Sequence, residues 1–195
     1  PQPSREVHNL ERSTADRVES DGTFTRRELF RVQILTAGGL AQYSQVGVAF
    51  LEANQQANLE ILKVQKPDGR VLDLLSSAPT DIAPVFPTEL PIYSDLRMLR
   101  AAVPSLGIGD QLEFESSVVS RPIAPDQVWI ETEFAEPTEV DEQTYVLDAP
   151  ANSHLTVSVR EGLAAKFDEE RKDGRWIRRW RIAAARSRSP ASCRR

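Results

Sequence analysis

Apolar and polar residues alternate with a period of two through most of this chain, and this alternation limits what it can fold into. In residues 24–35, for example, Phe30, Val32 and Ile34 fall on one face, with polar residues between them. A half-buried strand has this pattern because successive side chains point to opposite faces of a sheet. The pattern recurs in residues 42–51, 58–66, 70–75, 111–119, 127–134, 143–148, 154–160, 163–170 and 175–182. We therefore expect an all-β fold, an antiparallel β-sandwich of the immunoglobulin-like or a larger two-sheet type.

Turn-forming residues separate these segments. A Pro-Asp-Gly sequence that contains Asp68 and Gly69 lies between two alternating segments and predicts a tight hairpin. We expect Asp68 and Gly69 to set the register of this hairpin, because glycine adopts a positive φ at little cost. A turn that contacts a ligand is the alternative. The Asp-Gly pair at 173–174 predicts a second hairpin, and the glycine pair at 38–39 predicts a turn between two strands.

A proline-rich stretch interrupts the alternation at residues 76–92, where proline cannot donate the hydrogen bonds of a sheet. We expect a long ordered loop that crosses the sandwich, followed by a short turn and then a strand. Tyr93, Asp95 and Arg97 alternate and would share one face of an extended segment. Asp95 would then pair with Arg97 or with the next arginine, or cap backbone amides of the loop, and so hold the loop in place. A role in an interface is the alternative.

Residues 1–182 form the expected β-sandwich domain of this 195-residue chain, which is long enough to build a core without metals or disulfides. Residues 183–195 carry four arginines and no acidic residue. They predict a disordered basic tail, for which a truncated or out-of-frame coding sequence is one explanation. The formal net charge of −5 argues against a nucleic-acid partner. No apolar run approaches the ~20 residues of a membrane-spanning helix.

Residue types that often carry catalysis are scarce in this chain. The single cysteine, Cys193, lies in the basic tail, and the two histidines, His8 and His154, are widely separated. Structural zinc needs about four Cys or His ligands, so we expect no metal site. The sequence has no glycine-rich phosphate loop, so we expect no cofactor. Glu131 and Glu133 would share one face of a strand, where paired carboxylates could serve a hydrolase, but a solvated acidic face is the simpler explanation.

The three tryptophans are the largest apolar side chains. Trp176 and Trp180 share a face with Ile182 in their alternating segment. Burial of one tryptophan removes up to ~200 Å² from water, so Trp129, Trp176 and Trp180 are expected to lie in the core.

An ordered set of motifs gives residues 5–182 a resemblance to a known family. The motifs are Lys66-Pro67-Asp68-Gly69-Arg70-Val71, Pro91-Ile92-Tyr93-Ser94-Asp95-Leu96-Arg97, Val103-Pro104-Ser105-Leu106-Gly107-Ile108-Gly109-Asp110-Gln111-Leu112-Glu113-Phe114, Trp129 to Phe134 with Pro137, and Asp173-Gly174 with Trp176 and Trp180. In this order they resemble the uncharacterised bacterial domain that precedes transglutaminase-like domains in many exported proteins. The resemblance implies a β-sandwich without known activity, a transglutaminase-like domain downstream, and a periplasmic or extracellular location. The Cys-His-Asp triad of that downstream domain has no counterpart in this sequence.

We therefore expect a noncatalytic accessory module of a transglutaminase-like or peptidase-like protein, with a structural or partner-presenting role. Two alternatives stay open, namely a free-standing module that binds a peptide or a glycan, and a carboxylate-dependent hydrolase. The candidate structural or interaction positions are Asp68, Gly69, Tyr93, Asp95, Arg97, Trp129 and Trp180.

Overall fold

The computed structural model describes residues 5–77, 80–84, 95–124, 127–134, 140–159 and 165–183. Tyr93, Cys193 and most of the expected basic tail lie outside these residues. The elements are β1 (Val7–Val18), β2 (Phe24–Ile34), α1 (Ala37–Tyr43), β3 (Gln45–Leu51), β4 (Gln55–Gln65), β5 (Val71–Asp73), β6 (Thr80–Pro84), β7 (Leu96–Ala102), β8 (Gln111–Ser120), β9 (Val140–Pro150), β10 (Lys166–Lys172) and β11 (Arg175–Ala183). The expected all-β class is confirmed, with α1 as the single helix in the described part of the chain.

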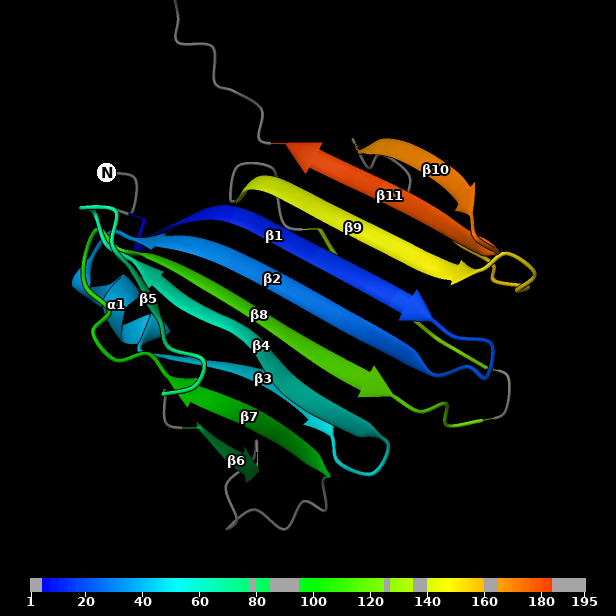
Figure 1. Ribbon diagram of the computed structural model, residues 1–195, viewed down its shortest axis with the longest axis horizontal. Helices are drawn as coiled ribbons and strands as arrows, with labels where there is room; N and C mark the ends of the chain where they lie inside the picture. Colours follow the sequence, from blue (N-terminus) through cyan, green and yellow to red (C-terminus); the bar gives the residue numbers. More distant parts are fainter. Residues whose placement is uncertain are drawn as a thin grey trace, which may run out of the picture.

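The strands form two sheets of unequal size (Figure 1). The large sheet has eight strands in the order β10-β11-β9-β1-β2-β8-β4-β5, and the small sheet has three in the order β3-β7-β6. The prediction of purely antiparallel sheets is wrong at one place, because β1 and β9 pair in parallel. Strand β1 was not expected from the sequence, although it lies at the centre of the large sheet.

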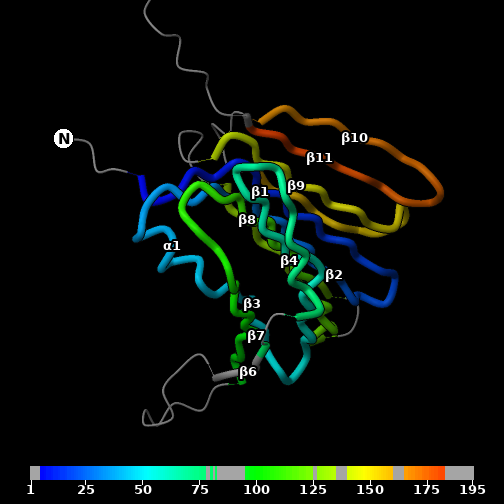
Figure 2. The backbone as a smooth tube through the Cα atoms, turned by 60° about the vertical axis from the view of Figure 1, so that its left-hand side comes forward, coloured from blue at the N-terminus to red at the C-terminus, as the bar shows by residue number. Residues whose placement is uncertain are grey.

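The small sheet packs over only one part of the large sheet (Figure 2). Val46 of β3 and Ala101 of β7 are buried against Leu62 and Val64 of β4 and Leu112 of β8. These contacts form the first core cluster. Their burial follows from the alternation of β3, β4 and β8, which places every second residue on the face between the sheets.

A second core cluster lies on the same face of the large sheet, beneath irregular chain. Trp180 is 7% exposed and packs with Tyr145 and Leu147 of β9. Val128 and Leu155 lie among the partly buried residues that cover this cluster. The core assignment of Trp180 is therefore confirmed. The expected strands at 127–134 and 154–160 are wrong for the residues that the structure describes there, because their backbone pairs with no strand.

The glycine pair at 38–39 lies in the first turn of helix α1 instead of forming a turn between two strands. Thr36 is the N-cap, and its hydroxyl accepts a hydrogen bond from Gly39 N at 3.2 Å. A Cβ atom on Gly39 would overlap the carbonyl oxygen of Glu6, so close backbone packing is what requires glycine here.

The Pro-Asp-Gly hairpin is confirmed between β4 and β5. Lys66 N donates to Arg70 O at 2.8 Å, and Gly69 adopts a φ of +88°. Asp68 accepts hydrogen bonds from Arg70 N at 3.0 Å and Arg70 Nε at 2.7 Å, which close the turn. Hydrogen bonding from Arg70 also lowers the pKa of the exposed Asp68 carboxyl. The expected hairpin at 173–174 is confirmed in the same way, with Gly174 at a φ of +73°.

Replacing Gly69 with alanine is expected to lower the free energy of unfolding by about 1–2 kcal/mol, because an L side chain is strained at positive φ. Nothing lies within 4 Å of the position of an added Cβ, so overlap does not contribute. Urea unfolding measures the change. Gly69→Asn is the control. It should lower the free energy of unfolding less than Gly69→Ala does, because asparagine tolerates this conformation. Equal losses in the two variants would contradict the assignment of the cost to backbone strain.

The proline-rich stretch contains a strand, which corrects the expectation of a loop throughout 76–92. Residues 80–84 form β6 at the edge of the small sheet, and the expected strand that follows is β7. The expected pairing of Asp95 with a nearby arginine is not found among the described residues. Arg97 instead pairs with Glu52 at 3.0 Å, and the carbonyl oxygen of Asp95 accepts Glu52 N at 3.0 Å. No helix among the described residues is long and apolar enough to cross a membrane.

Candidate binding groove on the inner face

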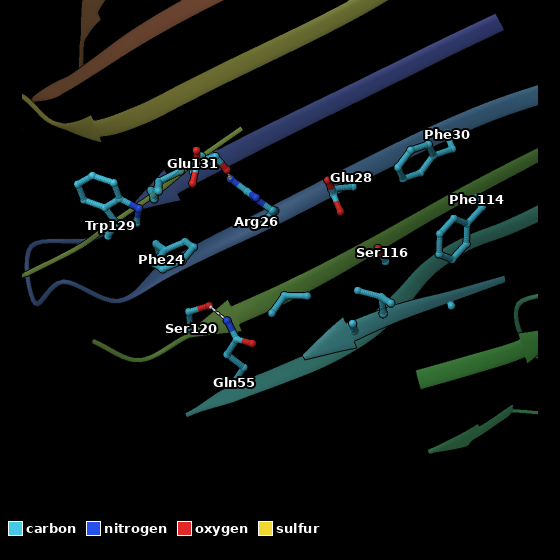
Figure 3. Close-up of a pocket in the computed structure, with 15 residues that line it drawn as sticks. Phe24, Arg26, Glu28, Phe30, Gln55, Phe114, Ser116, Ser120, Trp129 and Glu131 are labelled. Carbon is cyan, nitrogen blue, oxygen red and sulfur yellow. Dashed lines mark hydrogen bonds between the residues drawn. The ribbon is translucent and has the colours of Figure 1, made fainter. Parts of the chain in front are cut away.

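The inner face of the large sheet stays open between the small sheet and residues 127–134. There it forms a pocket of about 380 Å³, drawn in Figure 3. Strands β2 and β8 form the floor, β3 lies along one side, and residues 129–131 lie along the other. The lining residues are Phe24, Arg26, Glu28, Phe30, Gly47, Val48, Ala49, Gln55, Phe114, Ser116, Val118, Ser120, Trp129, Ile130 and Glu131.

Polar side chains interrupt the apolar inner face at this pocket. In β2, Arg26 and Glu28 lie between Phe24 and Phe30 on the same face, because all four have even positions in an alternating strand. Glu28 lies opposite Ser116 in the register of β2 and β8. The pocket floor therefore combines charged groups with aromatic rings, unlike the two core clusters on either side.

A buried ion pair anchors the floor. Arg26 donates to both carboxylate oxygens of Asp16 on β1, at 2.9 and 2.8 Å, and Tyr145 Oη donates to the same carboxylate at 2.9 Å. Asp16 is 1% exposed, so its charge depends on these partners. The hydrogen bond to Asp16 raises the pKa of Arg26. Burial raises the pKa of the Tyr145 phenol well above its usual range, and the charge of Asp16 adds to the rise.

The same arginine holds one wall of the pocket. Arg26 Nη2 donates to the carbonyl oxygen of Glu131 at 2.9 Å, which ties residues 127–134 across the sheet. Val128, Ile130 and Phe134 point down onto the second core cluster. Trp129 does not pack with them and is 85% exposed. Figure 3 shows its ring at the edge of the pocket.

Gln55 lies at the same end of the pocket as Phe24 and Trp129, in one row across the strands with Ser120 and Phe24. Its Nε2 donates to Ser120 Oγ at 3.0 Å, and its Oε1 accepts Leu51 N at 2.7 Å. A second hollow of about 930 Å³ shares Phe24, Gln55, Ser120 and Trp129 with the pocket. The two hollows therefore adjoin at these four residues, and we call them together the inner-face groove. Ile123, which is 88% exposed, lies with Trp129 in the lining of the second hollow.

The groove brings together few of the positions that the sequence singled out. Trp129 lines it, whereas Asp68, Gly69, Asp95, Arg97 and Trp180 do not. The core assignment of Trp129 is wrong, and the phase of its segment explains why. Val128 and Ile130 pack on the second core cluster, whereas Trp129 between them is 85% exposed. Glu131 lines the pocket, but Glu133 does not.

Three residues of the site were missed in the sequence, namely Asp16, Arg26 and Glu28. The available signal was a pair of charged residues at even positions of 24–34, where apolar residues otherwise share the face. Within the described ranges, no three His, Cys, Asp or Glu side chains lie close enough to hold a metal ion. The groove thus offers carboxylates, an amide and hydroxyls among aromatic rings, which is a set suited to binding.

Burial of the Tyr43 and Tyr145 phenols is expected to make the protein less stable at alkaline pH. Burial raises the pKa of Tyr43, as it does that of Tyr145, above the usual value of about 10. The contribution of these two phenols to the free energy of unfolding is therefore complete below about pH 10. It is lost as the pH rises through their folded-state pKa values. Urea unfolding at a series of pH values should give a decline above this pH, and the decline should be smaller in Tyr145→Phe. An identical decline in the variant would contradict the prediction for Tyr145.

Comparison with known proteins places the chain in a family. The model of a domain of unknown function with a solved structure, DUF3857, matches residues 20–187. The chain belongs to the DUF3857 family. This agrees with the resemblance to an uncharacterised domain that the sequence motifs indicated. No curated protein matches the chain in sequence.

Solved structures match this DUF3857 domain to different degrees. A candidate protease from Parabacteroides distasonis matches with a TM-score of 0.76 and 18% identity, over 97% of this chain and 38% of its own. An M1 zinc metallopeptidase from Deinococcus radiodurans matches with a TM-score of 0.43 and 10% identity, over 91% of this chain and 39% of its own. A CBM3a-L domain from a scaffoldin of the Clostridium thermocellum cellulosome has a TM-score of 0.34 and 10% identity, over 59% of this chain and 68% of its own. The chain therefore spans well under half of the length of the first of these proteins.

Proposed function

We propose that this DUF3857 domain is a noncatalytic accessory module of a larger exported protein of the transglutaminase-like or peptidase-like class. In this proposal the inner-face groove holds a neighbouring polypeptide, either to position it or to present it. The accessory role is the one that the sequence motifs imply, and the groove is the surface that would perform it.

The exposure of Trp129 is the observation that carries this proposal. An indole is among the most costly side chains to leave in water, and exposed apolar groups beside a concave surface are typical of interaction sites. Trp129 and Ile123 are both more than four-fifths exposed, and both lie along the groove. Tryptophan is also enriched among the residues that dominate the binding energy of protein interfaces.

The length of a structural relative supports a module that works within a longer protein. The candidate protease from Parabacteroides distasonis matches this chain over only 38% of its own length. The motif resemblance supports a transglutaminase-like domain as the neighbour and export as the context. The ion-paired floor supports a rigid binding surface, since Asp16 holds Arg26 by two hydrogen bonds.

The test is a calorimetric titration of the chain with a separately purified transglutaminase-like domain from a family member that contains both domains. We expect a complex, and covering Trp129 should shift the tryptophan emission to shorter wavelength. Trp129→Ala should weaken the complex at least about tenfold, as for a central interface tryptophan. Val71→Ala is the control, because Val71 is 57% exposed on β5 outside the groove. Absence of a complex, or wild-type affinity in Trp129→Ala, would contradict the proposal.

The noncatalytic part of the proposal is tested on the chain alone. The purified protein is incubated with peptide, ester and glycoside substrates, and Glu131→Gln is assayed in parallel because Glu131 is the pocket member of the Glu131 and Glu133 pair. We expect no turnover above that of buffer. Turnover that falls in Glu131→Gln would overturn the noncatalytic assignment in favour of a carboxylate-dependent hydrolase.

A further inference from the structure

Two carboxylates, those of Glu28 and Glu131, line the pocket. Glu28 on the floor and Glu131 on the wall make no side-chain hydrogen bond or ion pair with any of the residues described. Glu28 is half-buried between Arg26 and Phe30, and Figure 3 shows its carboxylate beside the pocket. A partly desolvated carboxylate is more stable when a cation or a hydrogen-bond donor reaches it.

The cations near these carboxylates are shared with other groups. Arg26 interacts electrostatically with Glu28, but its side chain forms an ion pair with Asp16 through two hydrogen bonds. Arg12 on β1 places its guanidinium 5.4 Å from the centre of the Phe30 ring and forms no ion pair with Glu28. The pocket therefore has a negative charge that the described side chains do not balance.

Aromatic rings surround the same carboxylates. Phe30 and Phe114 stack at 6.2 Å on one side of Glu28, and Phe24 and Trp129 lie on the other. Aromatic faces attract ammonium and guanidinium groups, and the attraction is strongest for tryptophan. A volume of about 380 Å³ is enough for one long side chain, and its apolar stem would lie against the rings.

We propose that the pocket binds a lysine or arginine side chain of the polypeptide that occupies the groove, with Glu28 and Glu131 as its counter-charges. This inference rests on the proposed function, because it names the chemistry of the polypeptide held there. The charged head reaches the carboxylates between the rings, while the rest of the peptide follows the second hollow past Ile123.

The test uses hexalysine, hexaarginine, hexaglutamine and hexaglutamate peptides, titrated into the intact chain while its tryptophan fluorescence is followed. We expect both basic peptides to bind and the neutral and acidic ones to bind at least about tenfold more weakly, a difference that one ion pair in a partly desolvated site can supply. Glu28→Gln and Glu131→Gln should each weaken hexalysine binding, and added salt should weaken it further.

Glu133→Gln is the matched control, because it removes the same charge two residues from Glu131 and does not line the pocket. It should bind hexalysine as the wild type does. Equal weakening in Glu133→Gln and Glu131→Gln would mean nonspecific attraction to an acidic protein and would overturn the inference. Unfolding midpoints of all the variants are measured first. Glu131→Gln serves as the decisive variant, because Glu131 is exposed and its replacement should leave folding intact.

Failure of the inference and failure of the proposed function give different results. If the transglutaminase-like domain binds and Trp129→Ala weakens it, but neither Glu28→Gln nor Glu131→Gln changes its affinity, the basic side chain is excluded while the groove keeps its role. If no basic peptide and no domain binds, both proposals are overturned.

Discussion

Replacing Arg26 with methionine is expected to lower the free energy of unfolding by about 3–5 kcal/mol, the usual loss when one partner of a buried ion pair is removed. The variant leaves the Asp16 carboxylate, which is 1% exposed, with Tyr145 as its one remaining side-chain partner among the described residues. It also removes the hydrogen bond to the carbonyl oxygen of Glu131, so residues 127–134 lose their tie to the sheet. Urea unfolding at neutral pH measures the loss.

Arg27→Met is the matched control for Arg26→Met. Arg27 is the next residue of β2, but its side chain is 60% exposed and its ion pair with Glu115 spans 3.8 Å. We expect a loss below about 1 kcal/mol, as for other exposed pairs. The double variant Asp16→Asn/Arg26→Met should recover most of the stability, because it removes the buried charge and keeps an acceptor for Tyr145. Similar losses at Arg26 and Arg27 would contradict a buried pair.

Replacing Trp180 with alanine is expected to lower the free energy of unfolding by about 3–5 kcal/mol. Trp180 is 7% exposed and its ring lies 5.5 Å from that of Tyr145 and 5.1 Å from that of Phe167, so truncation opens a cavity in the second core cluster. This is a large part of the stability of a typical domain. Calorimetric unfolding should give a clearly lower melting temperature.

Trp129→Ala provides the comparison within the same protein. Because Trp129 is 85% exposed, its truncation should change the free energy of unfolding by less than about 0.5 kcal/mol. Trp180→Ala should therefore lower stability without weakening binding. Trp129→Ala should weaken binding without lowering stability. A loss at Trp129 as large as that at Trp180 would mean that residues 127–134 are part of the core after all.

Local sequence patterns were sufficient to predict the strands in which apolar and polar residues alternate. Strands β2, β3, β4, β8 and β11 coincide with alternating segments, because burial of one face selects the residue type at every second position. The hairpin turns could also be predicted from the sequence, because the Asp-Gly pairs at 68–69 and 173–174 occur where a positive φ is required.

Strand β1 could not be predicted from local sequence patterns. Its inward positions include Arg12, Thr14 and Asp16, which are polar, so the segment shows no apolar alternation. Asp16 is buried only because Arg26 lies opposite it in the register of β1 and β2 and Tyr145 reaches it from β9. Such a compensated charge depends on partners 10 and 129 positions away in sequence, which a periodicity cannot reveal.

The sequence by itself determined the all-β class, the hairpin turns and the burial of Trp180, because each depends on neighbouring residues and on the two-residue repeat of a strand. Only the tertiary structure decided that β1 and β9 run parallel and that the small sheet leaves part of the large one open. It also decided that Trp129 stands at the edge of that opening. The physical reason is that a groove is the space between segments distant in sequence, whose positions follow from how the sheets pack.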